Sequence, residues 1–270
     1  MINKADIVAA VVIGRNEGER LLRCFDSLSE SLKTIIYVDS GSTDTSLIEA
    51  KKRGISTVSL DLDKPFTAAR ARNEGASALL EKYPDIQYIQ FVDGDCEVQK
   101  TWISEAYEFL EAEADFAIVC GRRRERFPDA TAFNQLCDYE WDTPIGESLS
   151  CGGDALIRAS AYRSVEGGYR ENMIAGEEPE MCFRMRELGW KIMRIDAEMT
   201  LHDAAMTSIT QWWKRHKRAG HAYAESNYLH GDSAEKFRLK ETRSDLVWAS
   251  LLPLILVASA WNWLIVFALA

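Results

Sequence analysis

The sequence predicts an α/β fold in which a mostly parallel sheet is flanked by helices and followed by one C-terminal hydrophobic helix. Short, continuous apolar runs alternate with segments of helical periodicity, as is typical of parallel strands that are buried on both faces. Polar clusters follow several of these runs. The stretch 246–270 contains no charged residue.

The elements follow in order along the chain. Apolar runs predict strands at 7–14, 34–40, 88–94 and 116–121. Periodic segments between them predict helices at about 17–31, 44–53, 67–82 and 100–113. We expect Asp44 and Thr101 to cap helices and Gly54 to end one. Residues 1–232 are expected to form one α/β domain, followed by a linker at 233–245 and a transmembrane segment at 246–270.

Composition narrows the class of protein. The 270 residues are 47% hydrophobic, which suits a chain with a sizeable core. A net charge of −10 argues against a nucleic-acid partner, because phosphate backbones favour basic domains. The six cysteines lack the paired spacing of a zinc site, so we expect free thiols in a reducing compartment.

The uncharged stretch 246–270 is long enough to cross a bilayer as a helix. The alternative is a buried helix of a soluble core. Arg238, Lys240 and Arg243 precede the stretch, and basic residues favour the cytoplasmic side. We therefore expect a protein of the inner or plasma membrane whose α/β domain lies in the cytoplasm.

Two carboxylates, Asp93 and Asp95, stand at the end of the apolar run near residue 90. Ligands of parallel sheets bind beyond the carboxyl ends of the strands. Carboxylates at this spacing can share one Mg²⁺, which leaves its other positions to water and substrate phosphates. An EF-hand would need Gly and Glu where this chain has Val98 and Ser104. The pair therefore predicts a metal that bridges to a diphosphate.

A second candidate is the stretch "GEEPE" at 176–180. Proline favours the first helical position, so we expect Glu178 to be the N-cap of a helix that begins at Pro179. Its buried stripe would then be Met181, Cys182, Met185 and Leu188. A carboxylate at a helix N-terminus could serve as a general base for a hydroxyl, or Glu177 and Glu178 could simply cap the helix. Glu180 and Arg184 are expected to form a surface pair.

Several motifs together resemble those of a known family. "VVIGRNEGERLLRCFDSL", "IIYVDSGSTDTS", "FTAARARNEGA" and "FVDGDCEV" are similar to the nucleotide-binding half of family 2 glycosyltransferases, which have the Rossmann-like GT-A fold. "CGGDALIRASAYRSVEGGYRENMIAGEEPEMCFRMRELGWKI" resembles their acceptor half. The resemblance covers about residues 6–205 and implies a nucleotide-binding half at 1–121 and an acceptor half at 122–232.

The resemblance implies a metal-dependent, inverting enzyme of the hexosyltransferase type. It would transfer a sugar from a nucleotide-diphosphate sugar, with a UDP-sugar favoured, to a hydroxyl of a glycan or lipid-linked acceptor. Polysaccharide or glycolipid synthesis would be its setting. Processive synthases carry Gln-x-x-Arg-Trp where this chain has Gln211-Trp212-Trp213-Lys214-Arg215, which argues against processive synthesis.

The resemblance also assigns roles to single residues. Donor contacts would come from Arg15, Asn16, Glu17, Asp39, Gly41, Arg70, Arg72, Asn73, Asp93 and Gly94. Asp95, Asp93 and His202 would hold Mn²⁺ or Mg²⁺, and an imidazole ligand favours Mn²⁺. Acceptor contacts would come from Gly152, Gly153, Asp154 and Trp212. The catalytic base would be Glu178 or its neighbour Glu177, since the family usually has Asp at this place.

Alternatives remain for several of these residues. Arg70 and Arg72 could belong to a solvated helix face, and His202, placed after a strand at 191–195, could be structural. The basic stretch "QWWKRHKRAGHAY" at 211–223 could cover the donor diphosphate or lie on anionic lipid headgroups. A sugar-nucleotide nucleotidylyltransferase and a non-catalytic nucleotide-sugar-binding membrane protein are the two rival functions.

Overall fold

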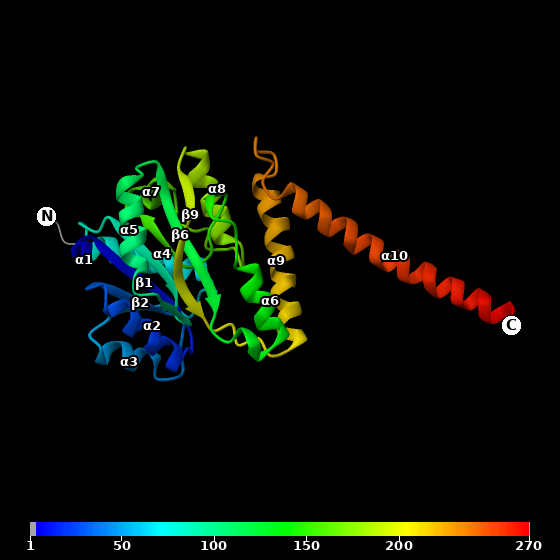
Figure 1. Cartoon of the computed structure of the whole chain (residues 1–270), viewed down its shortest axis with the longest axis horizontal. Helices are drawn as coiled ribbons and strands as arrows, with labels where there is room; N and C mark the ends of the chain where they lie inside the picture. Colours follow the sequence, from blue (N-terminus) through cyan, green and yellow to red (C-terminus); the bar gives the residue numbers. More distant parts are fainter. Residues whose placement is uncertain (1–3, 270) are drawn as a thin grey trace. The chain divides into compact units, whose positions relative to one another are not determined.

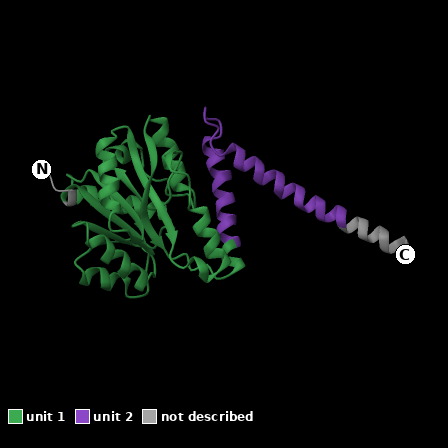
Figure 2. Cartoon of the chain, viewed as in Figure 1, with its two compact units in different colours: residues 1–212 green, residues 213–270 purple. Residues whose placement is uncertain are grey.

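The computed structural model describes residues 4–269, and the burial of side chains within residues 6–259. The chain divides into two compact units, Met1–Trp212 and Trp213–Ala270 (Figure 2). This boundary falls inside the predicted domain 1–232. Each unit is described separately below.

The first unit is built on a nine-stranded sheet with the order β3-β2-β1-β4-β8-β6-β9-β5, and β7 also pairs with β9 (Figure 1). The strands are β1 (Val8–Gly14), β2 (Ile35–Asp39), β3 (Ser56–Ser59), β4 (Tyr88–Asp93), β5 (Cys96–Val98), β6 (Phe116–Glu125), β7 (Gly146–Ser148), β8 (Ala155–Arg158) and β9 (Lys191–His202). The helices are α1 (Lys4–Ile7), α2 (Glu19–Ser29), α3 (Ser46–Lys52), α4 (Ala68–Lys82), α5 (Trp102–Ala112), the 3-10 turn η1 (Pro128–Ala130), α6 (Ala132–Glu140), α7 (Ala159–Ser164) and α8 (Glu177–Glu187).

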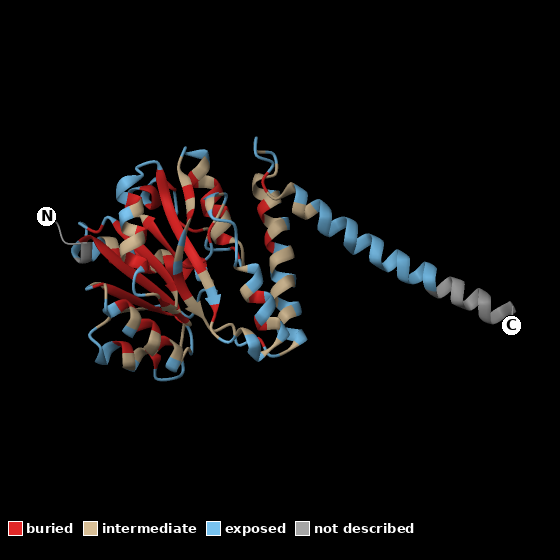
Figure 3. Ribbon diagram, viewed as in Figure 1, coloured by how far each residue is buried: buried red, intermediate tan, exposed pale blue. Residues whose placement is uncertain are grey.

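The parallel half of the sheet brings three strand ends together. β1 pairs in parallel with β2 and with β4, in a register that aligns Gly14 with Asp39 and Ile13 with Asp93. These strands are buried along almost their whole length (Figure 3), as expected for a sheet covered on both faces. The loops after β1, β2 and β4 therefore leave the sheet at one edge.

The other half of the sheet is mixed. β8 is antiparallel to both β4 and β6, whereas β6 and β9 are parallel. β5 runs antiparallel to β9, with Cys96 opposite His202. The predicted strand at 191–195 is thus too short, because pairing with β6 and then β5 carries β9 on to His202. His202 is the last residue of this strand rather than part of a following loop.

The predicted α/β fold is confirmed. The four predicted strands correspond to β1, β2, β4 and β6, and the four predicted helices to α2, α3, α4 and α5. β6 crosses the expected boundary between halves at residue 121 and continues to Glu125. Thr101 makes no side-chain cap hydrogen bond, and Asp44 lies one residue before the N-cap Thr45, where it accepts from the Ser46 N–H. The six cysteines are buried free thiols, as expected.

The start of α8 differs from the prediction. The helix begins at Glu177 after Gly176, whose φ of 82° lies in the left-handed region. Glu178 is therefore inside the first turn and is not the N-cap. Pro179 occupies the third helical position, where the missing N–H costs nothing because the first turn has no intrahelical acceptors.

The predicted buried stripe of α8 is correct for Met181, Cys182 and Met185, but Leu188 at the helix end is exposed. Glu180 and Arg184 form the predicted pair, but Glu180 is not on the surface. Glu180 is fully buried and accepts hydrogen bonds from both Arg170 and Arg184. Two guanidinium groups compensate the buried carboxylate.

The second unit contains most of α9 (Ile209–His230) together with α10 (Leu239–Leu269). The hydroxyl of Thr242 donates to the Tyr223 carbonyl at 3.1 Å, and the amide of Asn227 donates to the Phe237 carbonyl at 3.2 Å. These bonds tie the start of α10 to α9. The predicted linker 233–245 is accordingly helical from Leu239 onward.

Within the described residues, one helix is long and apolar enough to cross a membrane, with its candidate span at Leu239–Ser259. None of that span is buried, and large apolar side chains such as Leu254 and Leu256 are exposed (Figure 3). Residues 246–259 therefore do not form a buried core helix in the structure. Side chains from 260 to 270, which complete the predicted segment, lie outside the described ones.

Candidate active site

The loops after β1 and β2 are joined by Asn16. Its side-chain oxygen accepts hydrogen bonds from the N–H groups of Thr43 and Asp44, and its own N–H donates to the Ser42 hydroxyl. Asn16 has a φ of 58°, a left-handed conformation that Asn tolerates better than most residues. Asn16, predicted to contact the donor directly, holds the two loops in place.

Asp39 is buried at the end of β2. One carboxylate oxygen accepts from the N–H groups of Gly41 and Ser42, and the other accepts from the Tyr37 hydroxyl. Gly41, at a φ of +85°, lies against Leu62 and Phe66, and a side chain at this position would contact both. The guanidinium of Arg15 lies over the Phe66 ring at 5.2 Å. Three loops thus converge beyond β1 and β2, where a nucleoside could lie.

The two arginines of α4 are both buried, so the alternative of a solvated helix face is wrong for Arg70 and Arg72. Arg70 donates to the backbone carbonyls of Asp61, Lys64 and Pro65, and it therefore supports the loop before α4. The structure places the Arg70 guanidinium on these backbone carbonyls, and its contact with the donor phosphates stays a prediction.

Asn73 is also occupied by the fold. Its amide nitrogen donates to the carbonyls of Gly167 and Tyr169, and its oxygen accepts from the Tyr169 N–H and the Tyr162 hydroxyl. The hydrogen-bonding groups of Asn73 therefore hold the 162–171 segment, and its donor contact stays a prediction.

Arg72 lies at the centre of the site. It donates to Asp93 at 2.9 Å and to Glu177 at 2.8 Å, and it lies 3.1 Å from Glu178. A side chain at Gly153 would come within 2.3 Å of the same guanidinium. The absence of a side chain at Gly153 is therefore needed to bring the β8 side of the sheet against the Arg72–Asp93 pair.

A second arginine, Arg123 of β6, also holds Asp93. It donates to Asp93 at 2.9 Å and to Asp154 at 3.0 Å, and Asp154 accepts further bonds from the Asp93 N–H and the Thr200 hydroxyl. Burial alone would raise the pKa of Asp93, but Arg72 and Arg123 lower it to about 2. Asp93 is therefore a carboxylate at neutral pH, with both of its oxygens engaged by arginine.

Asp154 was expected to contact the acceptor. The structure shows instead a buried carboxylate that is satisfied by Arg123, Thr200 and the β4 backbone. Its geometry suits the positioning of Arg123 and Asp93. A direct acceptor contact of Asp154 stays a prediction.

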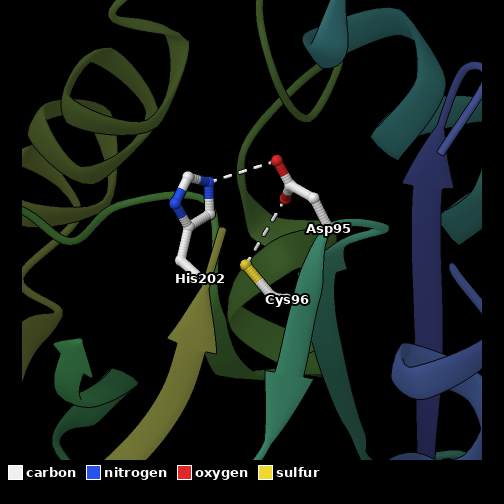
Figure 4. A group of neighbouring side chains, drawn as sticks. All are labelled: Asp95, Cys96 and His202. Carbon is white, nitrogen blue, oxygen red and sulfur yellow. Dashed lines mark hydrogen bonds and ion pairs between the residues drawn. The ribbon is translucent and has the colours of Figure 1, made fainter. Parts of the chain in front are cut away.

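Asp95 and His202 face one another just beyond β4 and at the end of β9 (Figure 4). The Nε2 atom of His202 lies 3.2 Å from Asp95 Oδ2, and the Cys96 thiol lies 3.6 Å from Asp95 Oδ1. Possible ligand atoms of all three residues lie within 4.8 Å of one another. Nδ1 of His202 is buried and has no hydrogen-bond partner among the described residues. The described part of the protein therefore leaves this ring nitrogen without a hydrogen bond.

The donor set fits a divalent cation held by Asp95 and His202. Carboxylate and imidazole suit Mn²⁺, and two protein ligands leave positions for the oxygens of a diphosphate. The thiol of Cys96 fits this role less well, because a soft sulfur ligand does not suit Mg²⁺ or Mn²⁺ and the thiol is already contacted by Arg123. Asp93, Cys96 and Asp154 form a second cluster of metal-ligand type, but Arg123 already contacts all three. A cation there would have to displace a guanidinium.

Glu17 and Gly94 border this pair. Burial raises the pKa of Glu17, and so does the nearby Asp95, while the Arg20 guanidinium at 2.6 Å lowers it. A side chain at Gly94 would lie 3.0 Å from the Ile13 carbonyl and 3.3 Å from Glu17 Cγ. Their predicted contact with the donor stays a prediction.

Glu178 has the strongest signature of a general base. Burial raises the pKa of Glu178 to about 7, the neighbouring Glu177 adds to this effect, and Arg72 opposes it. A base with a pKa near the working pH accepts a proton most effectively. Glu177 forms the closer bond to Arg72, so of the two carboxylates it is better placed to hold the arginine.

A pocket of about 260 Å³ opens beside these groups. Its lining includes Arg123, Trp141, Cys151 and Gly152. A Cβ added at Gly152 would meet no atom within 4 Å, and its place in an acceptor-site wall stays a prediction. Trp212 is not in the lining, and its ring packs near Phe133 of α6 at 6.4 Å. The structure thus brings Gly152 and Gly153 to the site but places Trp212 elsewhere.

Arg123 and Trp141 were not predicted from the sequence. Trp141 lies edge-on to His202 at 4.7 Å, and the Arg123 guanidinium lies over its ring at 5.4 Å. The available signal was the run Arg122-Arg123-Arg124 directly after an apolar strand. Cations that continue a buried strand need anionic partners. The sequence offers such a partner at another strand end, Asp93.

Comparison with known proteins agrees with this geometry. The family described as "Glycosyl transferase family 2" matches residues 9–158. No curated protein matches the chain. A structure of S. aureus TarS 1–349 in complex with UDP-GlcNAc has a TM-score of 0.61 at 12% identity, covering 90% of this chain and 72% of that chain.

Two further structures extend the comparison. The mannosyltransferase PcManGT from Pyrobaculum calidifontis, in complex with GDP-Man and Mn2+, has a TM-score of 0.61 at 16% identity, covering 86% of this chain and 67% of that one. The longer S. aureus TarS structure has a TM-score of 0.58 at 12% identity and covers 82% of this chain, which spans only 41% of that protein. At these identities the likeness concerns the fold.

Proposed function

Because the chain belongs to glycosyltransferase family 2, we propose that it transfers a sugar from a nucleotide-diphosphate sugar to a hydroxyl acceptor with inversion at the anomeric carbon. The observation that carries this proposal is the arrangement around Asp93. Asp95, which pairs with His202, lies two residues along the chain from Asp93, and Arg72 connects Asp93 to Glu178. This arrangement supports a diphosphate site next to a general base.

The donor would lie across the carboxyl ends of β1, β2 and β4. Arg15, Asp39 and Gly41 would surround the nucleoside, and Gly94, packed against Ile13 and Glu17, would lie near the diphosphate. Asp95 and His202 would hold Mn²⁺ or Mg²⁺, which supplies positive charge to the leaving diphosphate. A UDP-sugar is the favoured donor, and the neighbours that bind UDP-GlcNAc or GDP-Man support a nucleotide sugar.

Glu178 would remove the proton from the acceptor hydroxyl as the new bond forms. Inversion by a single displacement needs one such base on the acceptor side. Gly152 and Gly153 lie on that side, beside the pocket of about 260 Å³. The acceptor is proposed to be a glycan or a lipid-linked sugar, in polysaccharide or glycolipid synthesis.

We further propose that α10 anchors the protein in the inner or plasma membrane, with its catalytic unit in the cytoplasm. The exposed apolar span Leu239–Ser259 supports this, as do Arg238, Lys240 and Arg243 at its start. A lipid-linked acceptor would then be delivered in the same membrane.

The rival nucleotidylyltransferase would need a glycine-rich phosphate loop after β1. The loop after β1 is instead tied to the β2 loop by Asn16. The second rival, a non-catalytic binding protein, would bind nucleotide sugars without turnover.

One assay separates these functions. Full-length protein is incubated with UDP-, GDP- and dTDP-sugars and Mn²⁺, with and without glycan or lipid-linked acceptors, and nucleotide release is measured. Acceptor-dependent release of a nucleoside diphosphate supports transfer. Release of pyrophosphate from a nucleoside triphosphate and a sugar phosphate would indicate the nucleotidylyltransferase, and binding without release would indicate the non-catalytic protein.

A further inference from the structure

An exposed basic stripe runs along α9 and consists of Trp213, Lys214, Lys217 and Arg218. The three cations are spaced at i, i+3 and i+4 and therefore share one face of the helix. Ala222 and Ser226, farther along the helix, are buried. The basic stripe is thus exposed at the start of α9, before the part of the helix that is buried.

Among the described residues, the cations of this stripe are not engaged in ion pairs. In the part of the chain that the structure describes, neither Lys214, Lys217 nor Arg218 forms an ion pair. The sequence has no acidic residue between Asp203 and Glu225, although the whole chain carries a net charge of −10. The stripe is therefore a local concentration of positive charge on an acidic protein, and an anionic partner would complement it.

The stripe lies close to the start of the apolar span. Tyr223, whose carbonyl accepts the hydrogen bond from Thr242, is one to two turns beyond Arg218, roughly 8 Å along the helix axis. The candidate span begins at Leu239, and its first residues include two further exposed cations, Lys240 and Arg243. Trp213 is 64% exposed, and tryptophan favours the headgroup region of a bilayer.

We propose that the stripe on α9 binds the headgroups of anionic phospholipids in the leaflet that α10 enters. The cations would approach the lipid phosphates, with Trp213 at headgroup depth. This inference rests on the proposed membrane attachment through α10 and adds a preference for lipid charge. Such a surface would hold the catalytic unit near a lipid-linked acceptor.

The test uses Trp213 as a local reporter in the full chain. The protein is reconstituted into phosphatidylcholine vesicles that contain an equal minor fraction of either brominated phosphatidylglycerol or brominated phosphatidylcholine. Bromine quenches tryptophan at short range, and subtraction of the Trp213→Phe signal isolates Trp213. We expect at least about twofold stronger quenching by the anionic lipid, because Lys and Arg at a surface enrich anionic lipids nearby. High salt should reduce this difference.

Two variants make the experiment specific. The triple variant Lys214→Gln, Lys217→Gln, Arg218→Gln should remove the preference for the anionic lipid. A matched variant, Lys51→Gln, Lys52→Gln, Lys100→Gln, removes three exposed lysines of the first unit and should retain it. Equal quenching by the two lipids in the wild type, or none by either, would overturn the inference.

Trp248 of α10 separates the two proposals. Its signal, isolated with Trp248→Phe, should be quenched by both brominated lipids if α10 is inserted. An unquenched Trp248 would show that the membrane attachment itself is wrong. If the triple variant instead loses affinity for a UDP-sugar while its lipid quenching is unchanged, the stripe serves the donor diphosphate and the lipid proposal is rejected.

Discussion

Arg72 and Glu177, which are far apart in the sequence, form a buried ion pair at 2.8 Å. The same guanidinium bonds Asp93 at 2.9 Å, so one side chain connects the end of β4 with the start of α8. The proposed donor site and the proposed base are therefore coupled through a single buried cation, and its removal should affect stability as well as activity.

The Arg72→Met variant is expected to lose about 3–5 kcal/mol of unfolding free energy, because removal of one partner leaves buried carboxylates uncompensated. Urea unfolding of the full chain in detergent measures this. The control is Arg124→Met, which removes a half-exposed pair with Glu198 and should cost about 0–1 kcal/mol. Equal losses in the two variants would contradict the proposed central role of Arg72.

Substitution of the proposed base should separate chemistry from binding. Glu178→Gln should lower the transfer rate by about 10²–10⁴ and leave nucleotide-sugar affinity unchanged, because the donor contacts lie on other elements. Glu177→Gln should mainly destabilise the fold, since it breaks the closer bond to Arg72. If Glu177→Gln loses transfer while Glu178→Gln does not, the roles are reversed, and if both stay active, neither carboxylate is the base.

The pH dependence of transfer follows from the pKa of Glu178, which burial and Glu177 raise to about 7. The base must be ionised to accept a proton, so the rate at saturating donor should fall about tenfold per pH unit below that value and level off above it. Because Arg72 lowers this pKa, a folded Arg72→Met sample should show the fall at higher pH. A rate that is flat from acidic to neutral pH would exclude Glu178 as the base.

The metal assignment predicts different effects for three neighbouring residues. Asp95→Asn and His202→Ala should weaken Mn²⁺-dependent UDP binding by roughly 10–100-fold, the range usual for damage to a metal site. Cys96→Ser should leave it nearly unchanged, because a soft thiol does not suit Mn²⁺ or Mg²⁺ and Arg123 already contacts this sulfur. Calorimetry with and without EDTA measures these affinities. Donor binding that is equally tight in EDTA would remove the metal from the proposal.

The last prediction concerns the C-terminal helix α10. Truncation after Thr242 keeps the bond between Thr242 and Tyr223 but removes the exposed apolar residues from 246 onward. We expect a soluble, folded protein that still binds nucleotide sugar, whereas the full chain should need detergent. Fractionation and circular dichroism test this. A full chain that stays soluble without detergent, together with a truncated form that unfolds, would show that α10 belongs to a core.

Part of this fold could be read from the sequence because local patterns determine it. The strands β1, β2 and β4 are continuous apolar runs, and a parallel sheet places their carboxyl ends at one edge. Asp39, Asp93 and Asp95 could therefore be predicted to approach one another. The short strand β3, Ser56–Ser59, was missed because it is only partly buried and has no apolar run to mark it.

Tertiary structure alone decided how the polar groups of the site are paired. The sequence shows that Arg72, Asp93, Arg123 and Glu178 are chargeable, but only the packing of α4, β4, β6 and α8 shows which carboxylate each arginine neutralises. The predicted start of α8 at Pro179 is likewise wrong, because the left-handed Gly176 ends the preceding loop and the helix begins at Glu177, two residues earlier. Sequence patterns indicate which segments are buried and whether their apolar residues recur at helix or strand spacing. The pKa and the partner of a buried charge depend instead on residues that only the folded chain brings within 3 Å.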